Sequence, residues 1–145
     1  MSNRNNALVA LETQLGNIAD VTVIRCAEDP DDIWDEFAKA AWPGASNKLL
    51  VVQGKSSTPT SEKAATSSSG TKLVAVIHAY VKILGISARD SALNILLDDV
   101  WDEIYQNHTL GGAVSLATAL DINTKAVENL SPPYAGGEID VLVIT

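Results

Sequence analysis

The sequence contains few of the residue types that usually build metal centres and covalent cross-links. Among its 145 residues there is one cysteine, Cys26, and there are two histidines, His78 and His108. One cysteine cannot form an internal disulfide, and no cysteine or histidine pair has the spacing of zinc ligands. We therefore expect no disulfide and no metal site in this chain, and we interpret Cys26 as a buried, inert thiol.

Basic residues are also scarce. Ten Lys and Arg stand against eighteen Asp and Glu, which gives a formal net charge of -8. Proteins that hold nucleic acid by its phosphates need clustered Lys and Arg, so this composition argues against tight DNA binding. No stretch of about 20 apolar residues is present, and the opening segment lacks the apolar run of a signal peptide. We expect a soluble protein that is made in the cytoplasm and does not contact membranes.

The remaining residues predict one domain, residues 1–145, with 46% hydrophobic residues to form its core. Apolar spacing of three and four predicts an opening helix, and further helices are predicted from Asp29-Pro30 to Trp42 and over residues 87–105. Strands are predicted at residues 20–25, 47–53, 71–84, 113–122 and 138–145. This order indicates an α+β fold: a mixed, mainly antiparallel sheet of four to five strands with two to three helices packed on it.

A low-complexity segment follows the second predicted strand. The stretch "VVQGKSS" ends in Gly54-Lys55-Ser56, which resembles the end of a phosphate-binding loop. The first glycine of that loop is missing, since Leu49 stands in its place, and Ser and Thr replace the helix that should follow. We interpret residues 54–71 as a flexible loop.

The strand predicted at residues 71–84 has two different faces. Leu73, Ala75 and Ile77 begin an apolar face that should belong to the core. The opposite face mixes apolar and polar side chains, and the last strand adds Leu142 and Ile144, which point away from the core. We interpret this second surface as a subunit interface formed by Val74, Val76, His78, Tyr80, Leu142 and Ile144. An ordinary half-buried sheet face with a shielded His78 is the alternative.

An acidic run lies on the long predicted helix. Asp98, Asp99, Asp102 and Glu103 fall outside the apolar stripe of that helix. Clustered carboxylates can serve acid–base chemistry, but no second set of groups is visible beside them, and such a run is usually a solvated face. We expect no enzymatic activity and keep a small cytoplasmic enzyme that uses this face as the alternative.

Several segments together resemble the tail terminator proteins of long-tailed bacteriophages and related minor tail proteins. The resemblance rests on the opening helix, on "LLVVQG" before a variable loop, on "KLVAVIHAYV" and on "GGEIDVLVIT". It is strongest in "LNILLDDVWDEIYQNHTLGGAVSLATAL", where an acidic helix leaves through two glycines into a strand. It covers most of the chain but rests on pattern rather than on an invariant motif.

The resemblance implies a structural virion protein without catalytic residues and without a cofactor. Such a protein would form a ring with copies of itself, with six subunits implied by the family alone, cap the tail tube and end its growth. Its partners would be the tail tube protein, a head–tail connector or neck protein, and a sheath protein if the tail contracts. DNA would pass through the channel without specific binding. The protein would be assembled in the host cytoplasm and located in the neck region of the virion tail.

Two further expectations accompany this interpretation. The predicted loop, through Lys55, Ser56, Ser57, Thr58 and Lys63, would dock on the tail tube. Another neck or tail-completion protein of the virion fits the same patterns and stays an alternative.

Overall fold

The computed structural model describes residues 3–26, 32–39, 42, 46–59, 71–123, 130 and 132–145. Its elements follow in the order α1 (Asn3–Leu15), β1 (Thr22–Cys26), the π-helical turn η1 (Trp34–Ala38), β2 (Lys48–Pro59), β3 (Thr71–Lys82), α3 (Ile86–Gln106), β4 (Leu116–Asn123) and β5 (Tyr134–Ile144). The expected α+β class is confirmed: a five-stranded, mostly antiparallel sheet is combined with three helical elements.

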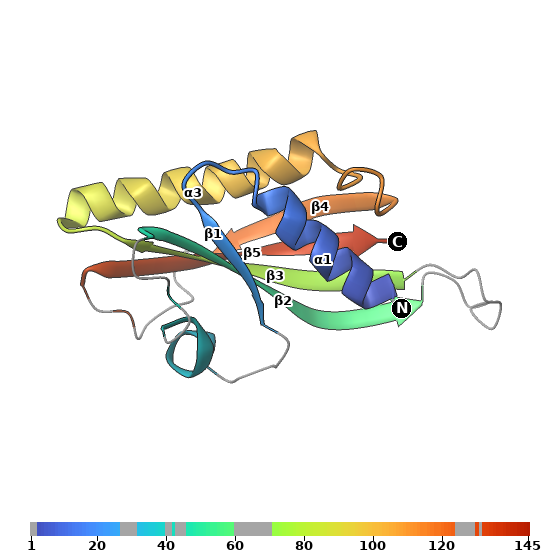
Figure 1. Ribbon diagram of the computed structural model, residues 1–145, viewed down its shortest axis with the longest axis horizontal. Helices are drawn as coiled ribbons and strands as arrows, with labels where there is room; N and C mark the ends of the chain where they lie inside the picture. Colours follow the sequence, from blue (N-terminus) through green and yellow to red (C-terminus); the bar gives the residue numbers. More distant parts are fainter. Residues whose placement is uncertain are drawn as a thin grey trace.

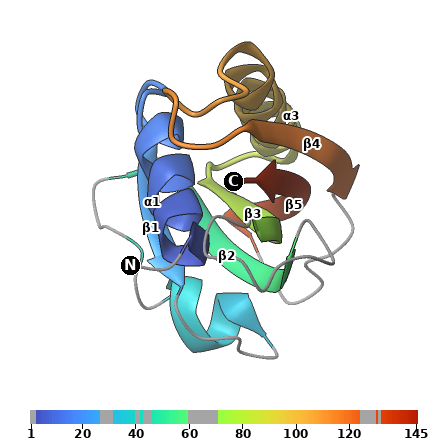
Figure 2. The same ribbon diagram turned by 90° about the vertical axis from the view of Figure 1, so that its right-hand side faces the viewer.

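The strands lie in the order β1-β2-β3-β5-β4 (Figure 1). β1 runs parallel to β2, and every other neighbouring pair is antiparallel. β1 and β4 are therefore the edge strands of the sheet among the described residues. Figure 2 shows these two strands on opposite sides of the molecule.

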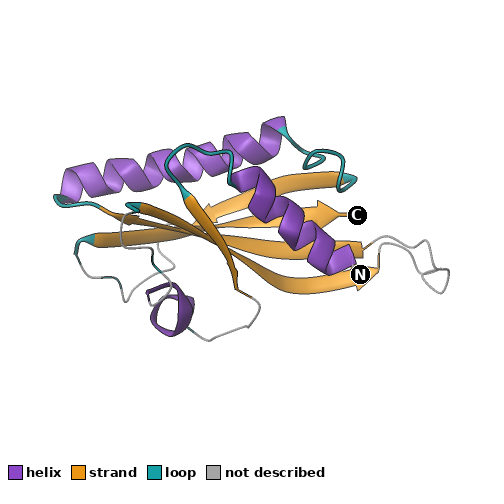
Figure 3. Cartoon of the chain, in the orientation of Figure 1, coloured by secondary structure: helices purple, strands orange, loops and turns teal. Residues whose placement is uncertain are grey.

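Both long helices cover the same face of the sheet (Figures 2 and 3). α3 presents a stripe of apolar residues at helical spacing, and the whole stripe is buried: Leu93, Leu96, Leu97, Val100 and Ile104. The odd-numbered face of β3, from Leu73 to Val81, packs in the same core, as the strand alternation predicts. α1 adds Ala7, Leu11 and Leu15 to it.

A second, smaller core lies on the opposite face of the sheet, under η1. Trp34 of η1 packs with its ring centroid 5.0 Å from that of Tyr80 and 4.9 Å from that of Tyr134. Trp42 adds an edge-on contact with Trp34 and another with Tyr134. Such aromatic contacts contribute about 0.5–1.5 kcal/mol each beyond the burial of their area. The sheet is consequently covered on both faces at this end.

The predicted bounds of the loop at residues 54–71 and of the last strand are wrong. β2 continues to Pro59 and pairs with β3 as far as Thr71, so residues 54–59 and residue 71 belong to a hairpin and not to a loop. β5 begins at Tyr134, before the start predicted at residue 138, and includes Gly136 and Gly137. Backbone hydrogen bonds of the sheet hold Ser, Thr and Gly here although their side chains do not favour strands. Of the helix predicted up to Trp42, the described part is η1; residues 27–31, 40–41 and 60–70 lie outside the described residues.

Candidate functional site

The side chains predicted to form a subunit interface fall into two groups. His78 and Tyr80 are buried inside the chain itself, and Val76 is buried with them. Tyr80 lies beneath Trp34, so its role in a contact between subunits is corrected: it belongs to the second core. Val74, Leu142 and Ile144 are half-buried and lie together on the sheet face opposite α3, since β3 pairs Val74 with Leu142 of β5.

His78 is the centre of a polar cluster that joins three strands. Its Nε2 lies 2.8 Å from Oε1 of Gln53 on β2, a hydrogen bond that is buried. Its Nδ1 lies 3.3 Å from Oε2 of Glu138, directly opposite on β5. That second contact has ion-pair distance but not hydrogen-bond geometry, so Nδ1 is a buried atom without a hydrogen-bond partner. The hydroxyl of Tyr80 is a second buried atom without such a partner. The alternative interpretation, a shielded His78 on a half-buried face, describes this position better than an exposed interface does.

The pKa values of Glu138 and of Asp140, which lies two residues further along β5, are shifted in opposite directions. The imidazole of His78 lowers the pKa of Glu138 by more than partial burial raises it. Burial raises the pKa of Asp140, and the carboxylates of Glu138 and Asp121 raise it further. A lowered carboxylate pKa adds stability above its unfolded-state value, and that stability is lost as the pH falls through the folded-state pKa. A raised pKa has the reverse sign, so ionised Asp140 costs stability once the pH rises above its folded-state pKa.

Neutral substitutions of these two carboxylates should therefore act in opposite directions at pH 7. We expect Glu138→Gln to lower the free energy of unfolding by about 0.5 kcal/mol and Asp140→Asn to raise it by about 0.3 kcal/mol, small values because both groups are partly exposed to solvent. Urea denaturation at pH 7 and pH 3.5 measures both effects, and each difference should shrink at the lower pH. Equal signs for the two variants at pH 7 would contradict the assignment.

The residues predicted to dock on a tail tube are mostly part of β2. Lys55 and Ser56 lie beside a register shift between Gly54 and Ser56, and both are exposed. The hydroxyl of Ser57 accepts a hydrogen bond of 2.6 Å from Nη1 of Arg4, which ties the hairpin to α1. Thr58 pairs with β3 through its backbone, and Lys63 lies outside the described residues. The Gly54-Lys55-Ser56 stretch thus sits inside a strand and does not precede a helix.

The acidic surface on α3 is divided between two positions. Asp98 and Asp102 are exposed, whereas Asp99 and Glu103 are half-buried. Asp99, Asp102 and Glu103 lie on the side of α3 that faces the segment after α1. Oε1 of Glu103 accepts a hydrogen bond of 2.8 Å from Nε2 of Gln14 on α1. In this part of the structure Glu103 holds two helices together. Across the described residues, no three Cys, His, Asp or Glu side chains form a group that could hold a metal ion.

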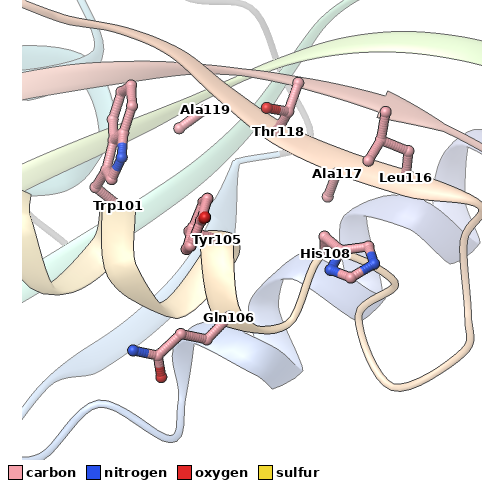
Figure 4. A pocket seen from close by; sticks show the side chains of 8 residues that line it. All are labelled: Trp101, Tyr105, Gln106, His108, Leu116, Ala117, Thr118 and Ala119. Atoms are coloured by element: carbon pink, nitrogen blue, oxygen red, sulfur yellow. The ribbon is translucent and has the colours of Figure 1, made fainter.

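A groove between α3 and the edge strand β4 was not predicted from the sequence. Its volume is about 500 Å³, and Figure 4 shows Trp101 and Tyr105 of α3 opposite Ala119, Thr118, Ala117 and Leu116 of β4, with His108 at one end. Tyr105 is 77% exposed and Leu116 is 37% exposed, so the groove presents apolar surface to solvent. The signal in the sequence was the pair Trp101 and Tyr105, four residues apart and outside the buried stripe of α3.

Comparison of the sequence with protein-family models gives no match, and no curated protein is significantly similar to it. No helix in the described part of the chain has the length and apolar character needed to cross a lipid bilayer. Its function is therefore argued from the fold, the groove and the sequence patterns.

Proposed function

We propose that the protein is a structural subunit of a bacteriophage tail, a tail terminator that forms a ring on the end of the tail tube. The observation that carries the proposal is the construction of the sheet. Its two edge strands, β1 and β4, are not paired with any further strand among the described residues, and an apolar groove follows one of them. A domain with two different, unpaired edges is suited to repeated head-to-tail association, which closes into a ring when the rotation per subunit divides the circle.

The charge of the chain supports the same role. An excess of eight negative charges lets DNA pass through a channel without being held by its phosphates. The exposed carboxylates of Asp98 and Asp102 contribute to this surface. In this role the protein needs neither a catalytic residue nor a cofactor, and its partners are the tail tube protein and a neck or connector protein, with a sheath protein in a contractile tail.

Negative-stain imaging of the purified protein, alone and with tail tubes that lack their terminator, tests the proposal. We expect closed rings with a central opening, and tubes that carry one such ring at one end. Lys55→Glu should reduce the fraction of capped tubes at least ~10-fold if the exposed part of β2 docks on the tube, because a reversed charge at a contact rim opposes encounter. Lys39→Glu, an equal change of charge at an exposed site at the end of η1, is the control.

A strictly monomeric protein at high concentration, still monomeric with tail tubes, would remove the basis for a ring-forming terminator. Equal capping by both Lys variants would leave the ring in place but would exclude Lys55 from the docking surface. Rings that form but do not bind the end of the tube would favour a neck or completion protein.

A further inference from the structure

The groove beside β4 is an apolar surface next to open backbone groups. The N–H of Ala117 donates a hydrogen bond of 2.6 Å to the carbonyl of His108 and therefore points away from β5. Along a strand, alternate residues direct their backbone groups to the same side, so the N–H and C=O of Ala119, the last residue before the register shift in β4, also point to the outer edge. An extended segment could pair with this edge while its side chains enter the space between Trp101 and Tyr105.

The opposite edge of the sheet carries a surface that fits this one. Nε of Arg25 on β1 lies 2.9 Å from Oε1 of Glu12, and its Nη1 lies 3.4 Å from Oδ1 of Asn5. The side of α1 that carries Asn5 and Glu12 therefore faces the β1 edge. Val9 lies between Asn5 and Glu12 by helical spacing, and it is 36% exposed. The β1 edge thus presents an apolar side chain on α1 above a short strand.

From these two surfaces we infer that the groove between α3 and β4 is the docking site for a second copy of the chain, which approaches with its β1 edge and α1. The inference takes the proposed ring as its starting point and names the surfaces that meet, but it can be tested without any tail. In this contact Val9 of one copy lies between Trp101 and Tyr105 of the next.

The direction of the strands supports the pairing. β1 runs parallel to β2, and three antiparallel steps lead from β2 through β3 and β5 to β4, so β1 and β4 point in opposite directions. A copy rotated about an axis along the strands keeps its strand directions, so its β1 lies antiparallel to β4 of the first copy. Antiparallel pairing is slightly more stable per residue than parallel pairing. Both helices lie on the same sheet face, so α1 of one copy comes beside α3 of its neighbour (Figure 2).

Charge favours a second copy over an unrelated occupant. Asp98 lies one turn before Trp101 on the same side of α3 and is exposed, which makes the border of the groove acidic. The β1 edge offers Arg25, whose guanidinium has five N–H donors and so can meet a further carboxylate beyond its contacts with Glu12 and Asn5. The contact is heterologous, because the surface on β4 differs from the surface on β1.

A pair of introduced cysteines tests the geometry. Val9→Cys with Tyr105→Cys in one chain should give, under mild oxidation, a ladder of disulfide-linked multimers on denaturing gels, because each copy has both halves of the contact. Each single variant should give monomer with no more than trace dimer, and Cys26, which is buried, serves as the internal background. A strong dimer band from either single variant would indicate a symmetric contact and would overturn the inference.

Charge substitution tests the energetics by light scattering. Tyr105→Asp should weaken self-association at least about 100-fold, because it places an uncompensated carboxylate in the contact beside Asp98. Ile95→Asp is the matched control: it changes another exposed apolar residue of α3, 55% exposed, that does not line the groove, and should leave association unchanged. Leu142→Asp, on the half-buried sheet face, should also leave it unchanged.

The outcomes separate this inference from the proposed function. Multimers that need Val9 and Tyr105 but never cap tail tubes would support the contact and exclude the terminator role. Rings that cap tubes and survive Tyr105→Asp would support the role and overturn the contact, and loss of rings in Leu142→Asp alone would place the interface on the sheet face. A wild type that stays monomeric at millimolar concentration would overturn the second copy as occupant of the groove.

Discussion

Tyr80→Ala is expected to lower the free energy of unfolding by about 3–5 kcal/mol, because it removes a fully buried ring against which Trp34 packs. Domains of this size are stable by about 5–15 kcal/mol, so the variant should be close to unfolding. Urea denaturation followed by tryptophan fluorescence measures the change. The measurement also decides whether Tyr80 serves folding or assembly, since an interface residue would alter association and leave the folded monomer stable.

Tyr80→Phe is the control for this loss. The hydroxyl of Tyr80 is buried without a hydrogen-bond partner, and the surrounding apolar groups raise its pKa through burial. Removing an unsatisfied buried hydroxyl relieves its desolvation cost, so Tyr80→Phe should stabilise the protein by up to about 1 kcal/mol. A loss of more than about 1 kcal/mol in Tyr80→Phe would mean that the hydroxyl has a partner that stabilises the fold.

Gly136→Ala is expected to cost about 1–3 kcal/mol through overpacking in the same region. A Cβ atom at Gly136 would lie 2.8 Å from Cδ1 of Tyr80 and 2.8 Å from Cδ1 of Leu130, and the ring is held in place by its aromatic neighbours. Thermal or urea unfolding of the variant measures the cost.

Gly54→Ala is the comparison, because an added Cβ atom would also lie very close to a neighbouring atom at this site. Its Cβ would lie 2.6 Å from Nη2 of Arg4, but that atom ends a long side chain that can move. We expect a cost below about 1 kcal/mol, mainly from the weakened bond between Arg4 and Ser57. Equal costs at Gly136 and Gly54 would show that Tyr80 is not a rigid neighbour.

Periodic patterns predicted the parts of the fold that local chemistry determines. The buried stripe of α3 and the odd-numbered face of β3 follow from spacing alone, and both are confirmed. The end of β2 could not be predicted in this way, because Ser56, Ser57 and Pro59 are poor strand residues that pair with β3 through the backbone.

Local sequence patterns predicted less of the candidate site than of the fold. Strand alternation correctly placed His78 and Tyr80 on the face opposite the helices, but it could not show that Trp34 and Trp42, far away in the sequence, cover part of that face. A further exposed apolar surface, which the sequence reasoning did not predict, lies at the β4 edge. Trp101 and Tyr105 gave a visible signal for it, since an apolar pair outside the buried stripe of a helix needs a second explanation.

The uneven covering of β3 also has a consequence for local unfolding. Near Tyr80 the strand is packed on both faces, whereas near Lys72 the second face is half open. Opening the sheet from the Lys72 end disrupts the main core alone, while opening at Tyr80 disrupts both cores at once. The free energy of opening therefore rises along a single strand, and brief excursions that expose backbone amides to water begin at the hairpin end and stop before the aromatic cluster.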